Sequence, residues 1–264
     1  MPFETIEVID QKHHIAITLN RPDALNSISS QMMDEIDGVL ESAEDRADLC
    51  AVSFTGNGRA FCAGVDLKGA QKRMQGADAA LVNSQFLDKL RRLLLRIENF
   101  PAPVIAAVNG LALAGGLELV LACDLVIAAE SAKLGDAHAN YGLVPGGGSS
   151  VRLPRKIGPT RAKQMIYTGD FLTASQLMDW GLVNHVVPDD ALGTELSEMV
   201  ATLGKRSPIG LRRMKRMVDD GLAQSVDAAL RYELSLNALH ALSNDRTEGL
   251  AAFNEKRKPN FKGN

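Results

Sequence analysis

Cysteine is scarce in this chain of 264 residues, which contains only Cys50, Cys62 and Cys123, with no Cys-x-x-Cys spacing. An odd number of cysteines without that spacing indicates neither a disulfide framework nor a zinc site. Unpaired thiols are typical of a reducing compartment. We therefore expect a cytoplasmic protein without a bound metal.

An excess of basic residues is also missing. Lysine and arginine number 29 against 32 acidic residues, which leaves a formal net charge of −3. Nucleic-acid-binding proteins normally carry a strongly basic domain or stripe, so nucleic acid is not an expected partner. Asn, Gly, Glu or Asp interrupts every apolar stretch before it reaches membrane-spanning length, and residues 1–10 do not resemble a signal peptide. No membrane association is expected.

The first part of the chain alternates between strand-like and helix-like patterns. Residues 3–10 and 14–20 alternate in the manner of a β-hairpin, and residues 30–45 carry apolar side chains at helical spacing. Residues 49–56 are typical of a buried strand. Further along, we expect a strand at 101–110, a turn at 111–116, a helix at 117–123 and a strand at 124–130.

Other segments complete this outline. Residues 69–82 have weak periodicity and are expected to form a mobile loop, followed by a helix over 83–100 that Asn83 or Ser84 caps. Thr173 and Gln176 form a capping-box pattern. After about residue 189 the patterns are helical only. The sequence thus predicts repeated strand–strand–helix units followed by an all-helical region.

Two segments rich in small residues are unlike plain scaffold. In residues 60–66, AFCAGVD, Gly64 lets the backbone turn sharply and present the amide of Val65 to a ligand. In residues 109–124, Gly115 lies where a turn becomes a helix, and the first amides of a helix are unpaired donors. Two such amides from separate loops can hold the oxygen of an enolate or a tetrahedral intermediate.

These segments belong to a series of blocks that resembles the enoyl-CoA hydratase/isomerase (crotonase) family. The blocks follow the order of the family and extend over nearly the whole chain, so coincidence is not a serious explanation. They are LNRPDALNSIS (19–29), GNGRAFCAGVDLK (56–68), PAPVIAAVNGLALAGGLELVLACDLVIAAESAKLGD (101–136), YGLVPGGGSSVRLPRKIG (141–158), WGLVNHVVP (180–188) and FNEKRKPNF (253–261).

The resemblance implies an α/β fold: a spiral of repeated ββα units in residues 1–190, followed by a helical region, residues 191–264, that assembles trimers or dimers of trimers. It implies an acyl-CoA thioester as the substrate. Coenzyme A then arrives as part of that substrate, and no separate cofactor is expected. The resemblance also assigns the oxyanion hole to the backbone amides of Val65 and Gly115.

Contacts to coenzyme A are implied where the chain matches the binding segments of the family. Asp23 stands where the hydratases often carry lysine, so one phosphate contact is lost and a negative charge is added. The tail that contains Lys262 resembles the segment that meets the adenine and phosphate end, sometimes from a neighbouring subunit. The implied contacts are Ala24, Leu25, Ala63, Asp66, Leu67, Lys68, Phe253 and Lys256.

Two positions bear on acid–base chemistry. Glu118 matches one of the two glutamates that hydratases of this family use, and its apolar neighbours Leu117 and Leu119 predict burial and a shifted pKa. His138 stands at the position of the second glutamate. With an ordinary pKa of about 6.5, it is either an acid–base partner of Glu118 or a neutral group that hydrogen-bonds the substrate or a loop carbonyl. Asp136 is expected to point away from the site.

Three functions remain open at this point. The favoured hypothesis is the addition of water to a 2-enoyl-CoA, with Glu118 as the base and His138 as its partner. With a single carboxylate, the site could instead shift a double bond, or help to hydrolyse or decarboxylate a thioester. The third hypothesis is a catalytically inactive CoA-ester-binding or scaffolding relative, which the missing second glutamate supports.

Overall fold

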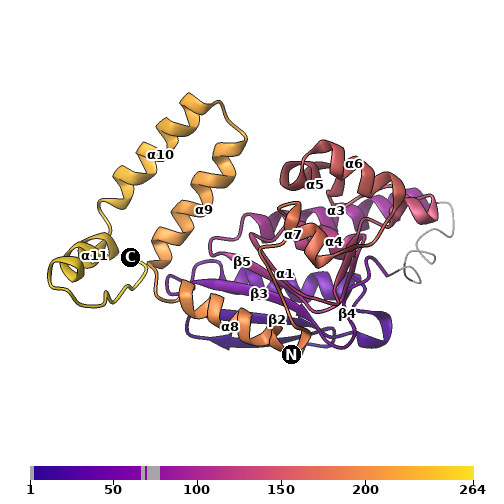
Figure 1. Ribbon diagram of the computed structural model, residues 1–264, viewed down its shortest axis with the longest axis horizontal. Coiled ribbons are helices and arrows are strands. Elements are labelled where there is room, and N and C mark those ends of the chain that lie inside the picture. Colours follow the sequence, from indigo (N-terminus) through magenta and orange to yellow (C-terminus); the bar gives the residue numbers. More distant parts are fainter. Residues whose placement is uncertain (1–2, 67–68, 70–77) are drawn as a thin grey trace.

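The computed structural model describes residues 3–66, 69 and 78–264, whose strands form two sheets with helices around them (Figure 1). The first sheet has the strand order β1–β2–β3–β5–β7–β10 and the second has β4–β6–β8–β9. The strands are β1 (Ile6–Gln11), β2 (His14–Leu19), β3 (Ala51–Gly56), β4 (Ala60–Cys62), β5 (Val104–Val108), β6 (Leu111–Leu113), β7 (Leu125–Ala129), β8 (Lys133–Gly135), β9 (Leu172–Thr173) and β10 (His185–Val187).

Successive strand pairs divide between the two sheets. Strand β3 lies in the first sheet and β4 in the second, and the pairs β5/β6 and β7/β8 divide in the same way. Strands β4, β6 and β8 run parallel to one another, so their carboxyl ends lie at the same edge of the second sheet. This arrangement confirms the predicted repetition of ββα units.

The hydrophobic periodicity predicted the buried faces correctly. In β2, Ile15, Ile17 and Leu19 are at most 2% exposed, whereas the alternate residues are partly exposed. Helix α1 (Ser30–Ala43) buries the stripe that contains Met33 and Leu40. The helices that follow are α3 (Ala79–Glu98), α4 (Gly115–Leu121), α5 (Ser149–Ile157), α6 (Pro159–Thr168) and α7 (Ala174–Asp179).

The predicted start of one helix and the predicted type of one segment were wrong. Helix α3 begins at Ala79 rather than at Asn83 or Ser84, because the alanines and leucine before Asn83 are strong helix formers. Most of the expected loop at 69–82 lies outside the described residues. Residues 111–113 form strand β6 rather than a turn. A strand of three residues is too short to show alternation, and its pairing with β4 and β8 decides its conformation.

The C-terminal region begins with η3 (Asp189–Ala191) and α8 (Leu192–Leu203). Helix α8 packs against β5 and β7, so by packing it belongs to the core. Helices α9 (Pro208–Leu222), α10 (Val226–His240) and α11 (Asn244–Asn254) project away from the core (Figure 1). The division at residue 190 remains a prediction. Among the described residues, no helix is long and apolar enough to cross a bilayer.

Glycines form the corners at which the chain passes from one sheet to the other. A Cβ atom on Gly56, at the end of β3, would lie 2.2 Å from the carbonyl oxygen of Ala60. A Cβ atom on Gly110, at the next corner, would lie 2.3 Å from the carbonyl oxygen of Arg59. The side chain of Asn109 joins the two corners by accepting a hydrogen bond from Gly56 N at 3.0 Å. These corners leave no room for a side chain.

We expect Gly56→Ala to lower the free energy of unfolding by about 3 kcal/mol or more, because backbone atoms on both sides must move. The matched control is Gly38→Ala in α1, where a Cβ atom would meet nothing within 4 Å. That substitution should raise stability by about 0.5–1 kcal/mol through the greater helix propensity of alanine. Urea unfolding measures both. Equal stabilities of the two variants would contradict the tight corner.

Candidate active site

The segments of the candidate site follow the carboxyl ends of three adjacent parallel strands. Val65 follows β4, Gly115 begins α4 just after β6, and His138 follows β8. The amide of Ala114 donates a hydrogen bond to the carbonyl oxygen of Gly135 at 2.9 Å, which ties the segments after β6 and β8 together. Parallel pairing therefore gathers residues that are far apart in the sequence.

The backbone amides of Val65 and Gly115 lie close to each other. A Cβ atom on Gly115 would lie 3.4 Å from Val65 N. The amide of Ile28 donates a hydrogen bond to the carbonyl oxygen of Gly64, and its carbonyl oxygen accepts one from the amide of Asp66. The amide of Val65, which lies between these two residues, takes no part in this pairing. Within the described part of the chain, neither Val65 N–H nor Gly115 N–H donates a hydrogen bond. Two neighbouring donors without acceptors can bind a developing oxyanion.

An unusual backbone holds these amides in place. Ala114 has φ 48° and ψ −116°, a conformation that costs on the order of 1–3 kcal/mol in a residue other than glycine. Gly64 has φ +104°, and a Cβ atom there would lie 3.1 Å from Ala114 Cβ. A Cβ atom on Gly116 would lie 1.9 Å from the carbonyl oxygen of Cys62. The two loops can approach this closely only because both carry glycine.

Glu118 lies in the first turn of α4 and is 1% exposed. Its Oε1 atom accepts hydrogen bonds from Gly147 N at 2.7 Å and from Ser149 N at 3.1 Å. Burial raises the pKa of the Glu118 carboxyl above its usual range, although these two hydrogen bonds and the nearby His138 oppose the rise. The predicted burial and pKa shift of Glu118 are both present.

The glycine-rich segment before α5 forms the wall that meets Glu118. A Cβ atom on Gly147 would lie 2.4 Å from Glu118 Oε2, so any side chain there would displace the Glu118 carboxyl. Behind this segment, Leu87 and Leu94 of α3 approach Gly146 and Gly147. The sequence suggested no role for Gly147 or Ser149. The signal that could have indicated their contact with Glu118 is the run of three glycines just before helix α5.

Asp136 and His138 meet directly. The Nδ1 atom of His138 lies 3.0 Å from Asp136 Oδ1, and the two side chains are 13% and 0% exposed. The expectation that Asp136 points away from the site was therefore wrong. Ala137, with φ 60°, turns the chain, and His138 N donates to the carbonyl oxygen of Asp136 at 2.8 Å. This tight turn directs both side chains to the same side.

The electrostatic surroundings favour the charged imidazolium of His138. Burial opposes the charge, but the hydrogen bond and charge of Asp136, together with the charge of Glu118, raise the pKa of His138 above its usual value. The charge of His138 in turn acts to lower the pKa of Glu118. Tyr141 ends the short helix η2 (His138–Tyr141) and is 73% exposed, so it points to solvent.

Several residues expected to contact coenzyme A lie next to this site. Ala24 ends the short helix η1 (Pro22–Ala24), and the carbonyl oxygen of Leu25 accepts a hydrogen bond from Ala63 N at 3.0 Å. Asp66 forms an ion pair of 2.9 Å with Arg21, a residue for which the sequence suggested no role. Asp23 lies exposed in η1. Leu67 and Lys68 lie outside the described residues.

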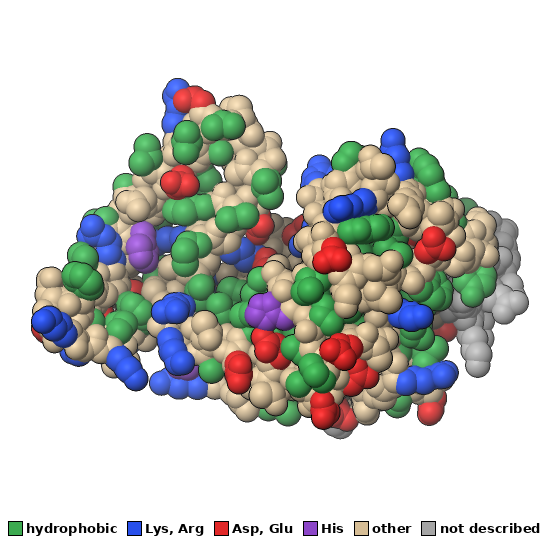
Figure 2. Space-filling view, viewed as in Figure 1, with side chains coloured by type: hydrophobic (Ala, Val, Ile, Leu, Met, Phe, Trp, Pro, Cys, Tyr) green, Lys and Arg blue, Asp and Glu red, His purple; other side chains and the backbone are tan. Residues whose placement is uncertain are grey.

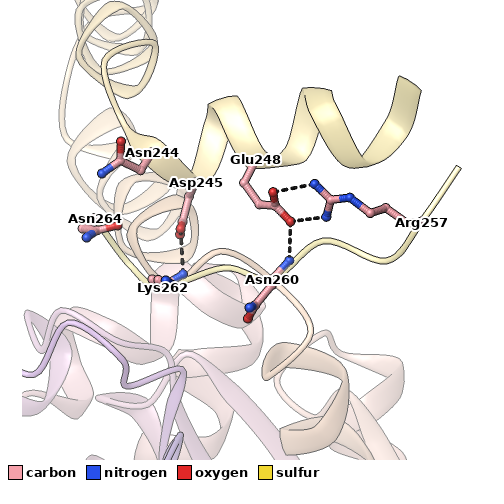
Figure 3. A pocket seen from close by; sticks show the side chains of 7 residues that line it. All are labelled: Asn244, Asp245, Glu248, Arg257, Asn260, Lys262 and Asn264. Atoms are coloured by element: carbon pink, nitrogen blue, oxygen red, sulfur yellow. Dashed lines mark hydrogen bonds and ion pairs between the residues drawn. The ribbon is translucent and has the colours of Figure 1, made fainter. Parts of the chain in front are cut away.

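Phe253 and Lys256 lie elsewhere. Phe253 is on α11 and 82% exposed, and Lys256 follows this helix, at the opposite end of the molecule from β4 and α4 (Figure 1). They do not join the site of their own chain. Figure 3 shows a polar hollow beside α11, which the side chain of Lys262 helps to line. In this hollow Glu248 forms an ion pair with Arg257, so these two charges are already neutralised within the chain.

Comparison with known proteins identifies the family. The family model described as enoyl-CoA hydratase/isomerase matches residues 10–264. The 2,3-dehydroadipyl-CoA hydratase of Escherichia coli strain K12 is 36% identical over 254 residues, which are 96% of each chain. The mitochondrial enoyl-CoA hydratase domain-containing protein 2 of Bos taurus is 38% identical over 252 residues, covering 94% of this chain and 83% of that protein.

The fold agrees with this relationship. The crystal structure of an enoyl-CoA hydratase from Bacillus anthracis matches with a TM-score of 0.93 and 37% identity, covering 99% of this chain and all of that one. The predicted α/β spiral of ββα units with C-terminal helices is thereby confirmed. This chain belongs to the enoyl-CoA hydratase/isomerase family of acyl-CoA-processing enzymes.

Proposed function

We propose that the protein adds water across the double bond of a 2-enoyl-CoA thioester. The observation that carries this proposal is the buried carboxyl of Glu118, which lies at the same strand edge as His138. Both lie at the strand edge that also presents the amides of Val65 and Gly115. A base, an acid and an oxyanion site are the groups that hydration requires, and the reaction needs no further cofactor.

In this mechanism the two amides bind the thioester oxygen. Glu118 accepts a proton from water as the water oxygen bonds to the β-carbon, and the electrons of the double bond move onto the thioester oxygen. The imidazolium of His138 then gives its proton to the α-carbon, which forms the hydroxyacyl-CoA. Removing one oxyanion donor typically costs about two to three powers of ten in rate.

We expect Glu118→Gln and His138→Ala each to lower kcat on crotonyl-CoA by about 10²- to 10⁴-fold, the usual contribution of a general acid or base. Loss of the conjugated-enoyl absorbance measures the reaction. The control is Glu130→Gln, which neutralises an exposed glutamate at the end of β7 and should leave the rate unchanged. Unimpaired turnover by Glu118→Gln would exclude Glu118 as the base.

Product analysis separates the alternative reactions. A hydroxyacyl-CoA supports hydration, an enoyl-CoA with a moved double bond supports isomerisation, and released coenzyme A supports hydrolysis. A lost carboxyl group would indicate decarboxylation. Tight binding of CoA esters without turnover across a broad panel of acyl-CoAs would favour an inactive binding or scaffolding relative.

The rate should follow a bell-shaped pH profile. Glu118 works deprotonated, so kcat/KM rises with pH through its pKa, which burial raises. His138 works protonated, so kcat/KM falls as pH rises through its pKa, which Asp136 and Glu118 raise against the effect of burial. The ordinary pKa of an imidazole is about 6.5. Because the pKa of His138 is raised, we expect the falling limb of the profile to lie above pH 6.5. In His138→Gln the residual activity should lack this limb, whereas an unchanged limb would assign it to another group.

Coenzyme A is proposed to lie along Ala24, Leu25, Ala63 and the segment from Asp66 to Lys68. The ion pair between Arg21 and Asp66 links the segment that carries Ala24 and Leu25 to the segment that follows β4. Phe253 and Lys256 would complete the coenzyme A site of a neighbouring subunit, because they lie at the far end of their own chain. A reducing compartment such as the cytoplasm remains our expectation for the location.

A homotrimer or a dimer of trimers would supply that neighbour. Figure 2 shows hydrophobic side chains over α9 and α10, and monomeric proteins rarely expose an apolar surface of this extent. Residues of this surface that are more than half exposed include Met214, Val218, Leu222, Val226, Leu230, Leu234 and Leu242.

We expect light scattering to give three or six times the chain mass of 28.3 kDa. Leu234→Lys should shift the protein toward smaller species, because it places a charge within the apolar surface. Ile9→Lys on the edge strand β1 is the control at comparable exposure, and it should leave the mass unchanged. A monomeric wild type would overturn the assembly proposal.

A further inference from the structure

The carboxyl group of Asp136 is held in an arrangement that a merely structural aspartate does not need. It is 0% exposed and contributes Oδ1 to the 3.0 Å contact with His138 Nδ1. Its other oxygen, Oδ2, is buried without a hydrogen-bond partner in the described part of the chain. Burying a carboxylate with one unsatisfied oxygen costs stability, so another benefit must offset this cost.

The contact determines which nitrogen of the imidazole carries a proton. A carboxylate only accepts hydrogen bonds, so Nδ1 of His138 donates to Asp136. In the neutral ring, Nε2 is then the nitrogen with a lone pair, and in the charged ring Nε2 carries the proton that can leave. Nε2 has no hydrogen-bond partner among the described residues.

We propose that Asp136 is a positioning residue that fixes the tautomer and orientation of His138, so that Nε2 is the nitrogen that exchanges a proton with the substrate. This inference rests on the proposed hydration, in which His138 is the acid. It assigns Asp136 a role that neither the family resemblance nor the proposed mechanism contains. A glutamate at position 138 would need no such partner, because its two oxygens are equivalent acceptors.

The charges around His138 come from two elements. Asp136 lies in the turn between β8 and η2, and Glu118 lies on α4. Both act to raise the pKa of His138 against the effect of burial. Asp136 makes the direct hydrogen bond, and Glu118 acts through its charge. Asp136 therefore favours the charged form of the acid, while Glu118 remains available as the base.

The first test measures the tautomer and the titration of the His138 imidazole and does not depend on enzyme activity. Long-range ¹H–¹⁵N spectra of wild-type protein are recorded across a pH titration, with His138→Gln identifying the signals. We expect a neutral form protonated at Nδ1 and a titration above the ordinary value of about 6.5. In Asp136→Asn, this titration should move to lower pH by about 1 to 3 pH units, as expected when an adjacent opposite charge is removed.

The second test uses kinetics. In Asp136→Asn we expect kcat on crotonyl-CoA to fall by about 10²-fold or more, with KM within about threefold, because the acid is misoriented while binding is kept. The falling limb of the pH profile should move to lower pH together with the titration. The control is Glu195→Gln, which removes the carboxylate of the surface pair His185–Glu195 and should change neither kcat nor the limb.

Each outcome is decisive. A neutral form of wild-type His138 protonated at Nε2, or an unchanged titration in a folded Asp136→Asn variant, overturns the positioning role. If Asp136→Asn does not fold, the tautomer of wild-type His138 decides the matter: protonation at Nδ1 in the neutral form supports the positioning role, and protonation at Nε2 overturns it. If wild-type protein hydrates no enoyl-CoA while the spectra behave as expected, the proposed reaction fails and the Asp136–His138 pair stands.

Discussion

Parallel pairing of β4, β6 and β8 is the constraint on which the rest of the site depends. Each of these short strands ends at the same edge and delivers one part of the site: an amide after β4, an amide and Glu118 after β6, and His138 after β8. Helix α4 can begin this close to the end of β4 because Gly116 packs against the carbonyl oxygen of Cys62 without a side chain between them. Removing that contact would separate the two amides and displace Glu118 with them.

Electrostatics distinguish this site from one built on two glutamates. A pair of carboxylates in a low-dielectric pocket repel each other, so one of them must hold a proton. Here an imidazole is hydrogen-bonded to Asp136, and the charges of Asp136 and Glu118 both favour its charged form. In the proposed mechanism the base is still a carboxylate, but the acid is a cation whose orientation we assign to a further residue, Asp136. The observation behind that assignment is Oδ2 of Asp136, which is buried and has no hydrogen-bond partner among the described residues.

The sequence anticipated the features that arise locally. The buried faces of β2 and α1 follow from periodicity, and the burial of Glu118 follows from its apolar neighbours. Helix α3 starts before the expected cap because Ala79 and Ala80 are strong helix formers. Strand β6 was missed because three residues show no period. The contact of Asp136 with His138 was missed because it depends on the turn at Ala137, whose positive φ nothing in the sequence indicates.

The order of the motifs, the hydrophobic periodicities and the identity of Glu118 and His138 were determined by the sequence alone. Only the tertiary structure decided that Oε1 of Glu118 meets the amides of Gly147 and Ser149, and that Phe253 lies far from the site of its own chain. The reason is physical. Periodicity and capping act within a few residues, whereas the site is assembled by strand register and close backbone approach between segments that the sequence keeps apart.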